Sequence, residues 1–292
     1  MSGFKDRVAA APISWGVCEV PGWGHQLEPE RVLREMRDLG VTATEFGPVG
    51  FLPDEPAATV ALLHEHGLTA VGGFLPVLLH DAGHDPLPEA DAYLDACVAA
   101  GADVMVLAAY TGGSGYDARP EIDETGWRTL LHNLDRIDER ARSRGVVAAL
   151  HPHVGTMVEG KSDVERVLEG SAVGLCVDTG HLLVGGTEPV ELTQRYVDRV
   201  VHVHLKDVDA GLAGRVRTGA VSYGDAILQG LFRPLGLGDV DLATLVRTLE
   251  DNGYKGWYVL EQDVKLSGEP EGEGPVASVR SSLEYLCGIG AA

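Results

Sequence analysis

The residues of this sequence that could do chemistry stand at the ends of short apolar runs. Imidazole nitrogens mixed with carboxylate oxygens suit manganese, cobalt, iron or zinc better than calcium or magnesium, which prefer oxygen donors. The sequence therefore predicts a divalent-metal site built from histidine and carboxylate side chains. Five runs end in such residues: Glu45; His151 and His153; Asp178 and His181; His202, His204, Lys206 and Asp207; Glu261 and Asp263.

Three of these residues follow three different runs, and we expect them to be metal ligands. Asp178, His204 and Glu261 would converge if the runs are strands that end at one face of a barrel. His151 or His153 is expected as a further ligand. Taken alone, Asp178 also fits a plain turn former, because an aspartate before Thr-Gly often caps the next segment. The expected convergence favours the metal-ligand interpretation.

The spacing around His204 extends the predicted site. Side chains of a strand alternate between its two faces, so His202, His204 and Lys206 share one face. If His204 points inward, Lys206 points into the same site. We expect Glu45, Lys206 and His181 to divide proton transfer and substrate binding among them.

A repeated alternation of β-rich runs and amphipathic helical stretches must position these residues. Two helical stretches carry boundary signals: 28–40 has Pro29 in its first turn and Gly40 at its end, and 241–253 has Asp241 as N-cap and Gly253 after its last turn. The strand candidates are residues 8–15, 41–47, 68–75, 104–110, 146–151, 173–178, 200–206 and 257–262.

This alternation predicts right-handed βαβ units and an α/β fold. A closed (β/α)8 TIM barrel is favoured over an open doubly wound sheet, which stays the alternative, because a closed barrel leaves no strand at an edge. No composition shift divides the chain, so residues 1–292 are expected to form a single domain. Its longest insertion, a loop at about 208–237, is a candidate lid or binding loop.

Composition narrows the classes of partner. The 292 residues include 23 Lys and Arg against 44 Asp and Glu, and the formal net charge of −21 disfavours nucleic acid and membrane surfaces as partners. Hydrophobic residues make up 45%, which excludes a disordered chain. The sequence has no signal-peptide pattern and no apolar run of membrane-spanning length, so we expect a cytoplasmic protein. A small-molecule substrate is the expected partner, and a homo-oligomer stays open.

Several stretches resemble one known family. Xylose isomerase-like barrels are similar to this sequence from about residue 8 to residue 285, and within them the sequence looks most like the inosose dehydratases, which dehydrate 2-keto-myo-inositol. The stretches that carry the resemblance are APISWG at 11–16, TEFG at 44–47, HPHVGT at 151–156, VDTGH at 177–181, HVHLKD at 202–207, GLFRP at 230–234 and GWYVLEQD at 256–263.

The resemblance implies a metal-binding enzyme of carbohydrate metabolism. It implies manganese or cobalt, with zinc or iron as alternatives, and glutathione as a cofactor linked to the dehydratases. Position by position, Asp178, His204 and Glu261 fall on the family's metal-ligand positions. The family's fourth ligand is a glutamate after the fifth strand; here His151 takes that place and is expected to be the fourth ligand.

The same resemblance assigns the substrate-binding residues. His181 falls on a substrate-contacting position, and Trp15, His153 and Arg233 lie in matching stretches and are expected to bind substrate as well. Trp15 also fits a core residue, an alternative that the sequence leaves open.

The strand-five histidine bears on the reaction that the resemblance implies. In the ketose 3-epimerases of this family, the strand-five glutamate and the strand-eight glutamate act as bases on opposite faces of the substrate. His151 breaks that pair, and a histidine-rich stretch ending in Gly-Thr resembles the dehydratases. We therefore expect a metal-dependent lyase that removes water from 2-keto-myo-inositol, a step of inositol catabolism, through an enolate whose charge the metal stabilises.

Other functions stay open. A sugar isomerase or epimerase, or an enzyme that eliminates from keto-glycosides, would use the same metal site, because reprotonation of the enolate gives epimerisation instead of water loss. A non-catalytic sugar-binding module is the alternative outside the enzymes. A DNA-repair endonuclease is disfavoured by the net charge of −21 and by the lack of further ligands for a three-metal cluster.

Overall fold

Eight short parallel strands close into one barrel in the computed structural model, which describes residues 4–113 and 115–289. Their order around the barrel is β1-β10-β7-β6-β5-β4-β3-β2, and β2 pairs with β1 to complete the circle. The strands are β1 Val8–Ala10, β2 Ala43–Glu45, β3 Thr69–Val77, β4 Val104–Ala109, β5 Val147–Leu150, β6 Gly174–Asp178, β7 Val200–Leu205 and β10 Tyr258–Leu260.

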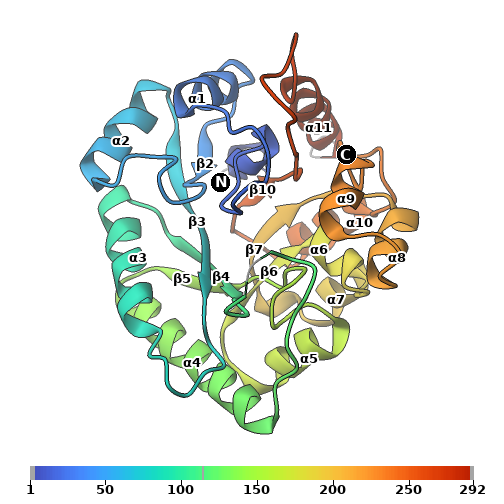
Figure 1. Cartoon of the computed structure of the whole chain (residues 1–292). Coiled ribbons are helices and arrows are strands. Elements are labelled where there is room, and N and C mark those ends of the chain that lie inside the picture. The colour runs from blue at the N-terminus through green and yellow to red at the C-terminus, as the bar shows by residue number, and fades with distance from the viewer. Residues whose placement is uncertain (1–3, 114, 290–292) are drawn as a thin grey trace.

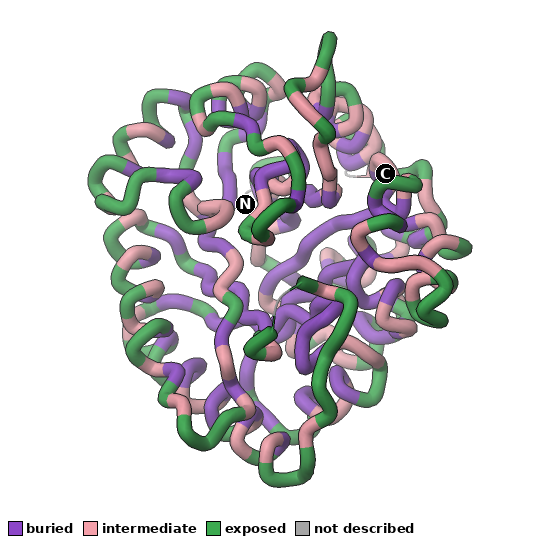
Figure 2. The backbone as a smooth tube through the Cα atoms, viewed as in Figure 1, coloured by how far each residue is buried: buried purple, intermediate pink, exposed green. Residues whose placement is uncertain are grey.

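Helices surround the strands, as Figure 1 shows. Figure 2 shows that the strands and the inner faces of the helices are buried, whereas the outer faces are exposed. The closed barrel predicted from the sequence is therefore confirmed, and the open sheet is not formed. The helices are α1 Pro29–Asp38, α2 Pro56–Glu65, α3 Leu87–Ala100, α4 Glu124–Ser143, α5 Lys161–Gly170, α6 Thr179–Val184, α7 Pro189–Arg195, α8 Ala210–Arg217, α9 Tyr223–Leu228, α10 Leu242–Asp251 and α11 Val276–Ile289.

The two helices with boundary signals begin and end as predicted. The side chain of Asp241 accepts a hydrogen bond of 2.9 Å from the Thr244 N–H and caps α10. Gly253 follows that helix with φ of 80°, a backbone conformation that glycine adopts without steric cost. Helix α1 begins at Pro29, whose missing N–H would have no partner in a first turn.

Two segments differ from the prediction. The first strand is shorter than the run 8–15, because the chain turns at Pro12 into a 3-10 helix, Pro12–Trp15. The segment 208–237, expected as a long loop, contains α8, α9 and a two-stranded antiparallel ribbon of β8 Asp207–Val208 and β9 Phe232–Arg233. Asp207 holds this insertion, since its buried carboxylate accepts hydrogen bonds from the backbone N–H groups of Gly236, Gly238 and Val240.

Arg7 links the first and last strands of the barrel, just before β1 pairs with β10. Its guanidinium donates to both carboxylate oxygens of Glu250, at 2.6 and 2.7 Å, and to the carbonyl oxygens of Tyr254 and Gly256. Arg7 is 9% exposed and Glu250 33% exposed at the side chain. The bidentate pair therefore ties the start of the first strand to α10, and the bonds to the two carbonyls tie it to the turn that leads into β10. Within residues 4–113 and 115–289, no helix has the length and apolar character that a membrane crossing requires.

Replacing Arg7 by Met should destabilise the barrel strongly. The variant leaves the Glu250 carboxylate without its cation, and we expect a loss near the lower end of the about 3–5 kcal/mol typical of a broken buried pair, because Glu250 is partly exposed. Urea unfolding measures the change in free energy. Arg37→Met is the control, since the pair that Arg37 forms with Asp38 is exposed and its loss should change stability by under about 1 kcal/mol. Equal losses in the two variants would contradict a closing role for Arg7.

Candidate active site

The polar strand ends predicted from the sequence meet at the carboxyl end of the barrel. Strand β7 directs His202 and His204 inward, and Lys206 follows on the same face; all three side chains are at most 2% exposed. Asp178 is the register partner of His204 on one neighbouring strand, and Val259, two residues before Glu261, is its partner on the other. Strand pairing therefore places one carboxylate on each side of His204.

Asp178, His204 and Glu261 form a donor set that fits a divalent metal ion. One ligand atom from each lies within 4.8 Å of the others, and all three residues are buried. Nδ1 of His204 stands 3.2 Å from Glu261 Oε2 and 3.6 Å from Asp178 Oδ2, and this nitrogen has no hydrogen-bond partner among the described residues. One nitrogen and two carboxylate oxygens directed at a common point are the mixed ligand set of manganese, cobalt, iron and zinc sites.

Asp178 carries both of the roles that the sequence left open. Its Oδ1 accepts a 2.7 Å hydrogen bond from the His181 N–H and caps α6, as a turn former would. Its Oδ2 stays available to the cluster, where it contacts Lys206 and His151. The helix cap thus orients the carboxylate that faces the metal-ligand set.

Lys206 lies among the carboxylates of this set. Its Nζ donates to Asp178 Oδ2 at 2.7 Å and to Glu261 Oε2 at 2.5 Å, and Asp263 Oδ1 is 3.3 Å away. Burial by itself lowers the pKa of the lysine, but the three carboxylates outweigh it and raise that pKa well above its usual value. Burial likewise acts to raise the pKa of Glu261, yet His204 and Lys206 lower it to about 2. The cluster is therefore an ionised network.

Three histidines form a second group beside the carboxylates. His151 Nε2 lies 3.1 Å from Asp178 Oδ2, so His151 contacts one predicted ligand but does not join all three. The rings of His153 and His181 pack with their centroids 3.7 Å apart. Nδ1 of His153 donates to the Val154 carbonyl at 2.7 Å, which leaves the lone pair on Nε2. Burial, with help from His151 and Lys206, lowers the pKa of His153 to about 3, so the ring is neutral.

The segment 208–237 contributes directly to the site. Tyr223, on α9, donates a 2.6 Å hydrogen bond to Asp263 Oδ2. His181 Nε2 lies 3.9 Å from the same oxygen and has no hydrogen-bond partner among the described residues. Burial and the neighbouring Glu261 raise the pKa of Asp263 to about 6, although Lys206 opposes this shift. The insertion therefore closes one side of the polar cluster.

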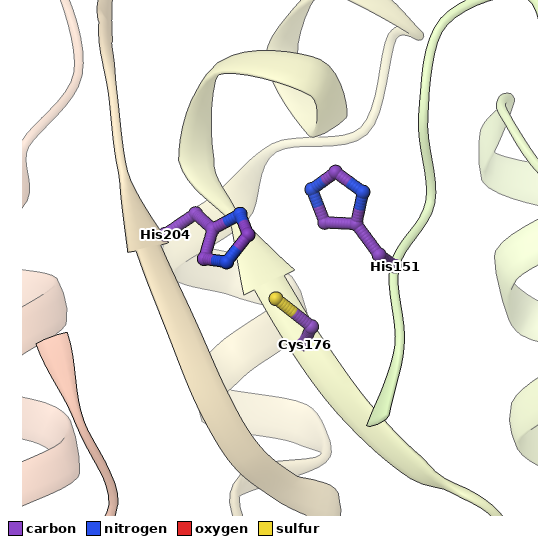
Figure 3. Close-up of side chains that lie close together, drawn as sticks. All are labelled: His151, Cys176 and His204. Carbon is purple, nitrogen blue, oxygen red and sulfur yellow. The ribbon is translucent and has the colours of Figure 1, made fainter. Parts of the chain in front are cut away.

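A further layer of side chains supports His204 from below. Glu45 Oε1 lies 2.9 Å from His202 Nε2 and 3.0 Å from His204 Nε2. Figure 3 shows Cys176 on β6 with its Sγ directed toward the His204 ring, and the His151 ring beside both; one ligand atom of each lies within 4.8 Å of the others. Burial raises the pKa of the Cys176 thiol to about 11, so it is an uncharged packing group.

A cavity of about 260 Å³ opens above these residues. Both the charged cluster and several apolar and aromatic side chains line it, a combination that suits a small polar molecule with apolar faces. The polar lining residues include Glu19, Glu45, His151, His153, His204, Lys206, Glu261 and Asp263, and the apolar ones include Ile13, Trp23, Phe74 and Tyr116.

Three residues predicted to bind substrate do not line this cavity. Trp15 is completely buried, and its indole N–H donates to Glu35 at 2.9 Å. Trp15 is therefore a core residue, the alternative that the sequence left open. Arg233 lies in the ribbon of the insertion and pairs with Asp209 at 3.1 Å. His181 packs against His153 and lies near Asp263, two residues that line the cavity, but does not line it itself. His153 lines the cavity as expected.

Several residues of the site were not assigned from the sequence. Glu261 and Asp263 are two positions apart, so the alternation that linked His204 to Lys206 would also have linked these two. The same rule would have placed Cys176 beneath Asp178. Tyr223 carries no such signal, because a residue in an insertion reaches the site only through the folding of α9.

Replacing Lys206 by Met should destabilise the metal-free protein and enlarge the stabilisation by metal. Two buried carboxylates would lose their cation, a change that costs about 3–5 kcal/mol for a broken buried pair, and an added ion would replace the missing charge. Thermal melts with and without manganese measure both effects. Lys255→Met removes an exposed lysine and is the control. A metal-induced rise in Tm no larger in the Lys206 variant than in the unmodified protein would contradict this role.

Known proteins are similar to this chain over most of the barrel, including the segments that carry the site residues. The family model of the xylose isomerase-like TIM barrel matches residues 33–287. An inosose dehydratase of Geobacillus kaustophilus (strain HTA426) is 30% identical over 293 residues, covering 96% of this chain and 93% of that protein. The rhizopine catabolism protein MocC of Rhizobium meliloti is 32% identical, covering 98% of this chain and 89% of its own.

Solved structures show the same fold at lower identity. A crystal structure of the IOLI protein with a bound zinc atom superposes with a TM-score of 0.70 at 13% identity, covering 98% of both chains. A 3-keto-D-glucoside 4-epimerase from E. coli gives a TM-score of 0.66 at 18% identity, covering 97% of this chain and 99% of its own. The family model spans most of the barrel and the relatives cover nearly the whole chain, as the sequence resemblance implied. The chain belongs to the xylose isomerase-like TIM barrel family.

Proposed function

We propose that this protein is a metal-dependent hydro-lyase that removes water from a keto-inositol, with 2-keto-myo-inositol as substrate and a diketone as product. The observation that carries the proposal is the convergence of ligand atoms from Asp178, His204 and Glu261, of which His204 and Glu261 also line the cavity. Similarity to an inosose dehydratase over 96% of the chain supports the choice of reaction.

The metal would be held by Asp178, His204 and Glu261. His151, which contacts the Asp178 carboxylate, would be a further ligand. Manganese or cobalt suits one nitrogen and two or more carboxylate oxygens. A divalent ion bound there stabilises the negative charge that develops on a substrate oxygen when the neighbouring carbon loses its proton.

The cavity offers separate groups for the two proton movements. Dehydration removes a proton from the carbon beside the carbonyl and breaks the C–O bond at the next carbon, whose hydroxyl leaves as water after it gains a proton; the resulting enol then tautomerises to the diketone. We assign the donated proton to Lys206, whose ammonium lines the cavity. We assign the proton removed from carbon to His153, which presents the free lone pair of Nε2 in the cavity.

The strand-five position supports elimination over epimerisation. An epimerase of this family needs two matched carboxylates, one on each face of the substrate carbon. At this position the cavity presents the imidazole of His151, which is buried between Asp178 and the aromatic ring of Phe74. The two faces of a bound ring would therefore meet chemically different groups, as an elimination with separate acid and base requires.

Incubation of 2-keto-myo-inositol in heavy water with the purified protein tests the reaction. We expect proton NMR, recorded after removal of protein and metal, to show the dehydrated diketone when manganese or cobalt is present and not in a chelator-treated control. Deuterium incorporation without loss of water would instead indicate an isomerase or epimerase. No change in the substrate would contradict the proposed reaction.

Replacing Glu261 by Gln should abolish the metal-dependent activity and leave the fold intact. The amide keeps the size of the side chain but removes one of the anionic ligands, so we expect activity to fall at least about 100-fold, in line with losses of metal ligation and transition-state stabilisation. Circular dichroism checks the fold, and Glu273→Gln, at an exposed helix-flanking carboxylate, is the control. Activity retained by the Glu261 variant would remove this residue from the ligand set.

A further inference from the structure

Glu45 stands directly beneath His204, although the two residues lie 159 positions apart in the sequence. It ends β2, is 3% exposed, and presents Oε1 to two imidazoles at once, those of His202 and His204. We propose that Glu45 is a positioning residue that fixes the tautomer and the ring orientation of His204, so that Nδ1 faces the metal. This inference rests on the metal site of the proposed function and adds a residue that acts through a ligand.

The hydrogen bonds determine which nitrogen carries the proton. A carboxylate oxygen only accepts hydrogen bonds, so Nε2 of His204, at 3.0 Å from Glu45, must be the N–H that donates. The lone pair of a neutral ring then lies on Nδ1. That atom faces Glu261 Oε2 at 3.2 Å and Asp178 Oδ2 at 3.6 Å, two further acceptors.

Nδ1 of His204 and the two carboxylate oxygens lie close enough together to bind one ion, and Lys206 already bridges the two carboxylates. Nδ1 of His204 has no hydrogen-bond partner among the described residues, so it is the ring nitrogen left to bind an ion. A divalent ion would accept all three lone pairs at once. A histidine that binds a metal through one nitrogen and donates from the other to a carboxylate is the arrangement that raises ligand basicity and holds the ring in place.

The position of Glu45 separates it from the proton-transfer groups. Glu45 contacts the Nε2 edge of the His204 ring, whereas the carboxylates that bind Lys206 contact the Nδ1 edge. The accepting Oε1 already has two donors, at 2.9 and 3.0 Å. The oxygen that holds His204 is therefore not free to act as a base, which supports an orienting role for this carboxylate oxygen.

Neighbouring side chains complete the support. His202 is completely buried and anchors Glu45 through its own Nε2. Cys176 lies against the His204 ring from the β6 side, and the His151 ring centroid is 4.9 Å from that of His204 (Figure 3). Glu45, Cys176 and His151 therefore pack around the ring, and the bond from Glu45 places an N–H on Nε2.

The test measures metal affinity in the absence of substrate. The chelator-treated protein is titrated with manganese by calorimetry and by competition with a chromophoric chelator. We expect one ion per chain in the unmodified protein and an affinity about 10–100-fold weaker in Glu45→Gln, the range seen when a partner of a ligating histidine is removed. Glu35→Gln is the matched control, because Glu35 likewise accepts from a buried aromatic N–H, that of Trp15, but lies outside the cavity lining; its affinity should stay within about twofold.

Glu45→Asp is the second variant, for use if the Glu45→Gln protein fails to fold. Its carboxylate keeps the charge but is one methylene shorter, so the hydrogen bond to Nε2 lengthens and an intermediate loss of affinity is expected. At saturating manganese, the dehydratase activity of the Glu45→Gln variant should recover most of its kcat if Glu45 only orients His204.

Unchanged affinity in both Glu45 variants would overturn the inference, as would activity lost at saturating metal with affinity intact, which would make Glu45 an acid or base. Two ions in the unmodified protein and one in Glu45→Gln would also overturn it, because Glu45, His202 and His204 would then be ligands of a second ion. Because the titration contains no substrate, absence of dehydration would leave this result standing. Absence of any metal binding would instead contradict the metal site itself.

Discussion

Three buried carboxylates, those of Asp178, Glu261 and Asp263, surround the single ammonium group of Lys206 at the carboxyl end of the barrel. Removing several anions from water costs several kcal/mol for each unless opposite charge and hydrogen bonds replace the lost hydration. Every other feature of the site follows from this constraint. The strand ends bring the anions together, and the cluster remains stable only while a cation, either the ammonium or a bound metal ion, stays among them.

The barrel supplies the geometry that this charge cluster requires. Parallel pairing of β7 with β6 and β10 sets Asp178 and Glu261 on either side of His204, and the helix cap of α6 fixes one of these carboxylates. Closure of the strands, tied by Arg7, prevents the ends from spreading. The insertion adds Tyr223, which holds Asp263 at the rim. Rigid strand ends thus carry the ligands, while the insertion shapes the entrance.

The sequence predicted the parts of this arrangement that depend on local periodicity. Alternation along β7 placed His204 and Lys206 on one face, and Asp241 marked the start of α10, because both features follow from the residues within a few positions. The convergence of Asp178, His204 and Glu261 followed from the rule that parallel strands end at one face. Trp15 was expected to bind substrate, but its side chain lies in the core, because the chain turns at Pro12 into a 3-10 helix.

The sequence did not predict contacts between residues that lie far apart along the chain. Arg233 and Tyr223 both belong to the segment between β7 and β10, yet only Tyr223 reaches the cluster, because α8 and α9 fold over the barrel in a way that no periodicity encodes. The bond between Glu45 and His204 likewise depends on β2 and β7 facing each other across the barrel. Residues of this kind are identified by the three-dimensional packing alone.

Anomalous scattering from crystals grown with manganese would test the central claim most directly. The account predicts one manganese peak per chain, bonded to Asp178, Glu261 and Nδ1 of His204, with the Lys206 ammonium moved out of its position between the two carboxylates. Crystals at saturating manganese that show no peak there, with Lys206 still bridging Asp178 and Glu261, would contradict it.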